Sequence, residues 1–347
     1  MKKVAIIGYG GMGKWHCDRI RENKVVELGG IYDINELRRE LAHEEGIFVY
    51  NSNEEIFSDP TIDIIVVATP NDVHEELIIK ALSSGKNAIC EKPATLSVES
   101  FDRMVEAQNK SGKLLSVHQN RRWDAEHLAI KSFVKTKELG EIIRIENRVH
   151  GSRGIPGDWR KEKKYGGGMI YDWGVHLIDQ TLQIIPEKII EVNCVSTYIT
   201  NSEVDDGFRL ELTFESGKTA HIEVGTYNFL TLPRFYVQCE NGTAIIPDWN
   251  NSVQLNKMTK WVEKNVVPVK TSAGITKTMA PRDVESCEKY EIELPKGDVH
   301  DFYRNFVNAI DKKEEQRIKN SEVRRVLQVI EAAFESNEIR QRLKLEI

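Results

Sequence analysis

The stretch VAIIGYGGMG, residues 4–13, constrains the fold of this chain more than any other. Four β-prone apolar residues run directly into a Gly-x-Gly-x-x-Gly pattern, and a helix-compatible segment follows. In a strand–turn–helix unit, Gly8 permits the tight turn, Gly10 lets the backbone approach a pyrophosphate, and Gly13 lets helix and strand pack closely. The free N–H groups at the helix N-terminus favour a phosphate. The motif therefore predicts a dinucleotide site.

A second apolar run, 25–32, ends at Asp33, twenty residues beyond Gly13. An acidic residue at that distance is placed to accept hydrogen bonds from the adenosine ribose. Because its charge repels a 2′-phosphate, the sequence favours NAD, with NADP less favoured. Arg38 and Arg39 fall on the next predicted helix, where we expect them to face solvent. The alternative interpretation is a plain strand–helix turn with a surface aspartate.

Composition excludes several classes of protein. The 347 residues are 40% hydrophobic and 29% charged, enough for a sizeable core and two domains. The net charge of −6 provides no basic field for nucleic acid or acidic lipid. Five scattered cysteines without a CxxC pair argue against a disulfide framework and fit a reducing compartment. With no signal-peptide pattern and no apolar run of about 20 residues, we expect a cytoplasmic protein.

Up to about residue 120, short apolar runs alternate with helix-like stretches. The predicted strands are 4–7, 25–32, 47–50, 62–68, 87–90 and 114–117, and the helices between them include 36–45, 72–84 and 98–110. Asp72 and Ser97 are the expected N-caps of the last two helices. The alternation predicts an α/β fold, with a Rossmann-type doubly wound parallel sheet over residues 1–121.

Farther along, strand-like runs follow one another with little helix between them. The expected elements are helices over 126–136 and 170–184, strands over 142–149, 189–199, 207–214, 219–226, 234–239 and 243–247, and closing helices over 299–310 and 321–342. This succession predicts an α+β domain over residues 122–347 with a mostly antiparallel open sheet. Its closing helices can pack back on the first domain. Residues 250–290 give no firm pattern. An open sheet face is a natural partner surface, so we expect a homodimer or homotetramer.

Polar side chains follow several predicted strands at their carboxyl ends, where open parallel sheets bind ligands. They are Thr69, Pro70 and Asn71 with His74 just beyond, then Glu91 and Lys92, then Asn120. Lys92 is the sharpest candidate, because a lysine in such a crevice can exchange a proton with a substrate hydroxyl or carbonyl. A solvated surface charge is the alternative.

The other candidate follows the triple glycine at 166–168. If the next segment is helical, Asp172 and His176 are four residues apart and share a face. A carboxylate beside an imidazole fixes its tautomer and raises its basicity, as a general acid/base requires. Asp179 continues that face, but no further His or Cys lies nearby, so we expect no metal. A histidine capped by a helical neighbour is the alternative.

In combination, these motifs resemble the glucose–fructose oxidoreductase, inositol dehydrogenase and rhizopine catabolism (Gfo/Idh/MocA) oxidoreductase family. The resemblance rests on the glycine motif, on Ala-Thr-Pro-Asn at 68–71 with His74, on Glu-Lys-Pro at 91–93, and on Asp172 with His176. The runs QNRRW at 119–123 and HLIDQ at 176–180 look closest to the scyllo-inositol dehydrogenase branch. The family resemblance implies that Lys92, Asp172 and His176 are catalytic. It also implies that Asn120 lies near the nicotinamide and that the C-terminal sheet pairs subunits.

Two features depart from that branch. Asp33 stands where its NADP-using members carry Ser-Arg, and the loop over 151–160 is unlike theirs, so we expect Trp159 in it to shape the substrate pocket. The predicted cofactor-binding residues are Gly8, Gly10, Gly11, Met12, Gly13, Asp33, Thr69, Pro70, Asn71, His74, Glu91, Lys92 and Asn120. The predicted substrate-binding residues are Lys92, Asn120, Trp159, Asp172 and His176.

The expected activity is NAD(P)-dependent hydride transfer to or from a secondary hydroxyl or ketone of a sugar, glycoside or cyclitol. His176, oriented by Asp172, takes the hydroxyl proton while Lys92 polarises the oxygen, and either of the two can be the primary base because coupled groups titrate together. One alternative is a regulatory protein that binds a dinucleotide without turnover. Another is a reductase of a keto- or anhydrosugar.

Overall fold

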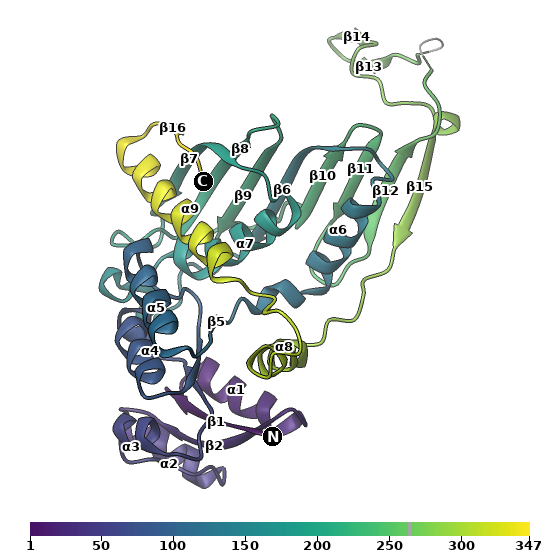
Figure 1. Ribbon diagram of the computed structural model, residues 1–347. Helices are drawn as coiled ribbons and strands as arrows, with labels where there is room; N and C mark the ends of the chain where they lie inside the picture. Colours follow the sequence, from purple (N-terminus) through teal and green to yellow (C-terminus); the bar gives the residue numbers. More distant parts are fainter. Residues whose placement is uncertain (263–265) are drawn as a thin grey trace.

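The computed structural model describes residues 1–262 and 266–347, which build two sheets with helices packed against them (Figure 1). The first sheet has five parallel strands in the order β2-β1-β3-β4-β5. Its strands are β1 (Lys2–Ile7), β2 (Val26–Tyr32), β3 (Ile64–Val67), β4 (Asn87–Cys90) and β5 (Leu115–Val117). The helices between them are α1 (Gly11–Glu22), α2 (Glu36–Glu44), α3 (Asn53–Ser58), α4 (His74–Ser83) and α5 (Val98–Ser111). The predicted doubly wound sheet is confirmed.

Local chemistry explains where the prediction of these elements succeeds and fails. All four residues of β3 are buried, as a strand covered on both faces requires. Ser97 caps α5 as predicted, accepting a hydrogen bond from the Ser100 N–H at 3.2 Å. Asp72 does not cap α4, because a 3-10 turn over Asn71–Val73 precedes the helix. The predicted strand 47–50 is wrong: the run makes only one isolated parallel bridge, from Val49 to Ile31 of the edge strand β2.

The second sheet has nine strands in the order β15-β12-β11-β10-β6-β9-β8-β7-β16. They are β6 (Ile142–His150), β7 (Ile189–Thr197), β8 (Gly207–Phe214), β9 (Thr219–Gly225), β10 (Phe235–Cys239), β11 (Gly242–Ile246), β12 (Val253–Met258), β15 (Cys287–Ile292) and β16 (Leu343–Lys344). Among the described strands of this second sheet, only β6 and β9 pair in parallel, which confirms the mostly antiparallel sheet. Two strands, β12 and β15, lie in the region that gave no firm sequence pattern.

Helices cover one face of this sheet. They are α6 (Ala125–Thr136), α7 (Val175–Ile184) and α9 (Asn320–Ile339), which lie across the strands in Figure 1. Strand β8 shows the reason, because its apolar residues at 208, 210, 212 and 214 are buried while Arg209 and Glu211 are exposed. The opposite face therefore stays open to solvent.

Two further elements lie outside these layers. The hairpin β13 (Val269–Thr271) and β14 (Gly274–Thr276) extends away from the sheet beyond β15, and α8 (His300–Ile310) returns to the first sheet beside α1 (Figure 1). Across the described residues, no helix has both the length and the apolar character that a membrane crossing demands.

Candidate active site

A cleft of about 550 Å³ lies at the carboxyl ends of β1, β3 and β4. The strand order reverses between β1 and β3, so this is the topological switch point at which open α/β sheets bind ligands. Its lining comes from both halves of the chain: Gly10, Gly11, Met12, Arg38, Ala68, Thr69, Pro70, Asn71, Glu91, Lys92, Asn120 and Arg121 from the first, and Asp158, Trp159, Arg160, Asp172, Trp173 and His176 from the second.

The glycine turn has the geometry that its sequence predicts. Gly8 has φ +97°, and a Cβ on it would lie 2.5 Å from the Ala68 carbonyl oxygen. A Cβ on Gly13 would lie 1.9 Å from the Gly8 carbonyl oxygen, so strand and helix pack in contact there. Gly11 faces open space, and Gly10 precedes α1 with no side-chain cap among the described residues. The first N–H groups of α1 are thus available to a pyrophosphate.

Asp33 is nearly buried at the adenosine end of the cleft. Its Oδ2 accepts the Tyr9 N–H at 2.6 Å, and its Oδ1 accepts the Asn35 N–H at 2.8 Å. Arg38 donates to the same carboxylate at 3.3 Å and lines the cleft beside Gly10. Arg38 is exposed, as expected, with half of its side-chain surface accessible, but the Asp33 charge attracts its guanidinium toward the turn.

The segment after β3 joins the two halves of the chain. Asn71 donates from Nδ2 to the carbonyl oxygens of Tyr165 and Gly166, at 3.1 and 3.3 Å. His74 is fully buried, with its ring nitrogens 3.0 Å from the Thr69 carbonyl oxygen and 3.1 Å from that of Pro93. Its position between these two backbone carbonyls makes the imidazole a structural link between two cleft loops, and burial lowers its pKa.

Lys92 and Asp172 form an ion pair across the cleft. Lys92 Nζ donates to Asp172 Oδ1 at 3.0 Å and to the Asp172 carbonyl oxygen at 2.9 Å. Arg160 Nε donates to the other carboxylate oxygen at 3.2 Å. Burial opposes ionisation of Asp172, but the two cations outweigh it and lower the pKa of this carboxyl below its ordinary value. The lysine is thus held in one position by a charged partner.

His176 lies on α7 and lines the same cleft. Burial, together with the positive charges of Lys92 and Arg121, holds the pKa of His176 well below its ordinary value, so the ring is neutral. Its Nδ1 has no hydrogen-bond partner in the described parts of the chain. The expected bond from Asp172 to this imidazole is wrong, because two cations compete for the carboxylate and charge-assisted bonds are stronger.

The lining fits a nicotinamide dinucleotide. Besides the glycine turn, the cleft contains buried polar atoms, Asn120 Oδ1 and Thr69 Oγ1, for which the described residues provide no partner. Buried polar atoms are normally satisfied, so these two are suited to a bound polar ligand. The predicted residues Pro70, Glu91 and Trp159 also line the cleft, whereas Gly8, Gly13, Asp33 and His74 support it from behind.

Sequence reasoning missed part of the substrate end. The guanidinium of Arg121 lies over the Trp173 ring, with Cζ 4.1 Å from the ring centroid. The ring centroids of Trp173 and His176 are 5.9 Å apart. Asp124 holds Arg121 at 3.1 Å. Trp173 directly follows Asp172 in the sequence, and this position next to a predicted catalytic residue is the signal that could have identified it as part of the site. Asp179, considered as an extension of the Asp172 face, pairs instead with Arg122 at 2.6 Å.

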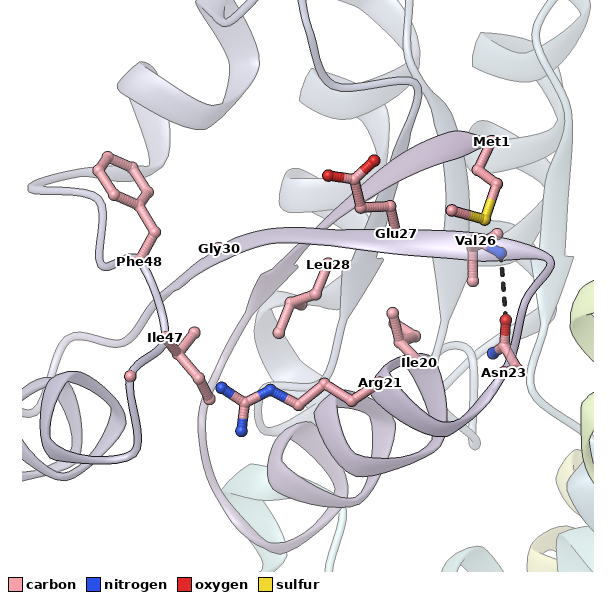
Figure 2. A pocket seen from close by; sticks show the side chains of 11 residues that line it. Met1, Ile20, Arg21, Asn23, Val26, Glu27, Leu28, Gly30, Ile47 and Phe48 are labelled. Carbon is pink, nitrogen blue, oxygen red and sulfur yellow. Dashed lines mark hydrogen bonds between the residues drawn. The ribbon is translucent and has the colours of Figure 1, made fainter.

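A second hollow of about 370 Å³ lies beside β2 and the end of α1 (Figure 2). Apolar side chains such as Ile20, Leu28 and Phe48 line much of it, and the Asn23 side chain accepts the Val26 N–H at 3.1 Å. It begins at the amino end of β2, opposite the edge at which such sheets bind ligands. Since it contains no predicted site residue, it has no part in the site.

Two family models match the chain. The model of the oxidoreductase family with an NAD-binding Rossmann fold, Gfo/Idh/MocA, matches residues 2–119. The model of the Gfo/Idh/MocA C-terminal domain matches residues 127–245. The first match spans the five-stranded sheet, and the second spans β6 to β10 together with the cleft residues from Asp158 to His176.

Individual relatives extend over most of the chain. The crystal structure of an NAD-binding protein from Listeria innocua is 41% identical, with a TM-score of 0.96 and coverage of 99% of both chains. An uncharacterized oxidoreductase of Schizosaccharomyces pombe is 29% identical over 312 residues, 84% of each chain. The scyllo-inositol 2-dehydrogenase (NADP⁺) of Bacillus subtilis is 31% identical over 222 residues, which is 61% of this chain and 60% of that enzyme.

Proposed function

Because the chain belongs to the Gfo/Idh/MocA oxidoreductase family, we propose that it transfers a hydride to or from a secondary hydroxyl or ketone of a sugar, glycoside or cyclitol. The observation that carries the proposal is the single cleft that brings the dinucleotide turn together with Lys92, Asp172 and His176. When bound, the nicotinamide provides the hydride acceptor or donor at its C4 atom. The chain provides binding, orientation and proton transfer.

Lys92 and His176 divide the work on the reacting oxygen. The ammonium of Lys92, held by Asp172, donates a hydrogen bond to that oxygen and stabilises negative charge on it. The neutral His176 takes the hydroxyl proton in oxidation and returns it in reduction. In this scheme Asp172 fixes the lysine instead of orienting the histidine.

The lining of the cleft supports a polyhydroxylated ring as substrate. Trp159 and Trp173 provide flat apolar surface, while Asp158, Arg121 and Arg160 provide hydrogen-bonding groups beside it. Apolar rings with a few convergent polar groups are typical of small-molecule sites. The similarity to a scyllo-inositol dehydrogenase makes inositols the first compounds to test.

The proposal is tested by following cofactor reduction at 340 nm with NAD⁺ or NADP⁺ over a panel of inositols, aldoses, glycosides and anhydrosugars. We expect turnover with at least one polyol, and reduction of the matching ketone by NADH or NADPH. Tight binding of NADH without turnover on the whole panel in either direction would support the non-catalytic alternative.

We expect kcat/KM to be higher with NAD⁺ than with NADP⁺. The Asp33 carboxylate at the adenosine end repels a 2′-phosphate, and like-charge contacts cost several kcal/mol. In Asp33→Ser, with Arg38 freed from its partner, the NADP⁺/NAD⁺ ratio of kcat/KM should rise about tenfold or more. Adding Arg38→Ala should remove much of that gain. The NADP⁺/NAD⁺ ratio is the right measure because Asp33 also supports the glycine turn, so its loss can lower kcat/KM with both cofactors alike. A wild-type preference for NADP⁺ would contradict the expectation.

We also propose that copies of the chain pair through the open face of the nine-stranded sheet. Charges of both signs alternate there: Arg144 lies 2.6 Å from Glu146, and Arg148 lies 3.1 Å from Glu223. Such a face can be complementary to itself across a twofold axis. Light scattering should give at least twice the mass of one chain, and Arg144→Glu, at a half-exposed side chain of this face, should weaken the assembly. A wild-type monomer at micromolar concentration would count against the pairing.

A further inference from the structure

Four buried polar side chains form a hydrogen-bonded chain that ends at the residue before Lys92. They are Tyr303 on α8, His16 on α1, Glu91 after β4 and His118 after β5, and none is more than 4% exposed. His16 Nδ1 lies 2.5 Å from the Tyr303 hydroxyl, and His16 Nε2 lies 2.8 Å from Glu91 Oε1. His118 Nδ1 lies 2.7 Å from the same carboxylate oxygen. The proposed chemistry uses none of the contacts among these four side chains.

A single arrangement of protons satisfies every contact. Burial and the neighbouring His118 lower the pKa of His16, so its ring is neutral and carries one N–H. That N–H must be at Nε2, because a lone pair facing the Glu91 carboxylate would be repelled. Nδ1 then accepts the Tyr303 O–H. Although burial opposes it, donation from both imidazoles holds the pKa of Glu91 well below its usual range, so the carboxylate is charged.

The same three side chains, His16, Glu91 and His118, are also of the types that bind zinc. Two donors each about 2.0–2.1 Å from a tetrahedral zinc lie about 3.3 Å apart. The observed separations of 2.7 and 2.8 Å are instead ordinary hydrogen-bond lengths. The cluster is therefore a hydrogen-bonded network.

This network connects three parts of the cleft at one carboxylate. Glu91 Oε2 accepts the backbone N–H of Lys92 at 3.2 Å, so the carboxylate braces the main chain that carries the lysine. His16 belongs to the helix that starts at the glycine turn, and His118 lies two residues before Asn120. A displacement of the Glu91 carboxylate would thus shift the backbone of Lys92 directly.

The network is completed from the far end of the chain. Tyr303 is separated from His16 by 287 positions, and its neighbour Phe302 packs its ring against that of His118, with centroids 4.7 Å apart. Figure 1 shows α8 returning past the second sheet to lie beside α1. Among the described residues, the hydroxyl of Tyr303 is therefore the only hydrogen-bond donor to His16 Nδ1.

We propose that Tyr303 is a positioning residue, which through His16 and Glu91 fixes the backbone at Lys92 and so aims Nζ at Asp172 and the substrate oxygen. This inference rests on the role proposed above for Lys92. Tyr303 is not among the described residues that line the cleft, and its effect passes through the shared carboxylate.

The test is Tyr303→Phe, which removes only the hydroxyl. Its matched control is Tyr50→Phe, because the Tyr50 hydroxyl also donates to a carboxylate, Asp59, at 2.7 Å, but it lies next to the edge strand β2 and does not line the cleft. The substrate-independent measurement is the rate at which acetic anhydride acetylates Lys92, read by mass spectrometry and normalised to the exposed Lys110. We expect about threefold faster labelling of Lys92 in Tyr303→Phe, since its hold on Asp172 loosens, and no change in the control.

With the best polyol of the panel, kcat of Tyr303→Phe should fall about tenfold while substrate KM changes less than about twofold. Glu91→Gln, which keeps the shape but not the charge, should raise Lys92 labelling in the same way. Wild-type labelling and wild-type kcat in Tyr303→Phe would overturn the inference. If Lys92→Ala in the same series keeps full kcat, the proposed function fails instead, whichever result Tyr303→Phe gives.

Discussion

Replacing Lys92 with alanine is expected to lower kcat by about 10²–10⁴-fold, the range that positioned acid–base groups typically contribute. The reason is geometric: Nζ is held by two oxygens of Asp172, in the cleft that His176 also lines. The dissociation constant of NADH, measured by fluorescence, should change little, because the variant leaves intact the glycine turn and Asp33, which we propose as the main cofactor-binding groups.

Lys86→Ala is the matched control for that variant. Lys86 is a buried lysine that, like Lys92, lies next to β4, but it is at the amino end of the strand, where Nζ donates to the Ile62 carbonyl oxygen at 2.8 Å. Its loss should lower the melting temperature and leave kcat close to the wild-type value. Near-native kcat in Lys92→Ala would show that the reacting oxygen lies elsewhere.

Replacing His176 with alanine should lower kcat by about 10²-fold or more, because the neutral imidazole is the proposed proton acceptor. His127→Ala serves as the control, since His127 is equally buried on α6 but does not line the cleft. The double variant of Lys92 and His176 should lose less than the product of the two single losses, as expected for groups that act as a unit. Additive losses would contradict a shared role.

The pH profile gives an independent check on His176. Burial and nearby cations lower its pKa, so the basic form persists to pH values below the ordinary histidine value of about 6.5. The kcat/KM for oxidation should therefore stay level on acidification through pH 6.5 and fall only at lower pH. In His176→Ala this acidic limb should disappear. A limb retained in the variant would assign the titration to another group.

The parts of the site that depend on local chain pattern could be predicted from the sequence. Gly8 and Gly13 are set by the turn itself, and Lys92 was found because parallel strands end at one edge of a sheet. The pairing of Asp172 was not found, since Lys92 lies 80 residues away and Arg160 comes from an irregular loop. Spacing along a helix shows which residues can meet, but it does not show which stronger partner arrives from another element.

The same limit explains the roles of His74 and His16. The sequence placed His74 at the cofactor, but the fold buries it between two carbonyl oxygens, behind the residues that line the cleft. Nothing near His16 in the sequence indicates Glu91 or Tyr303 as partners, because the three come from different elements and meet only after α8 packs against α1. Long-range polar contacts of this kind need the tertiary structure.

The ion pair of Lys92 and Asp172 has a consequence for how such a chain can diversify. The lysine belongs to the half that binds the dinucleotide, while the aspartate, the histidine and the tryptophan-bearing loop at 158–160 belong to the other half. Substitutions in that loop can reshape the space around the substrate without disturbing the glycine turn or the lysine. Selection for a new substrate can therefore act on one half of the molecule while the redox half stays unchanged.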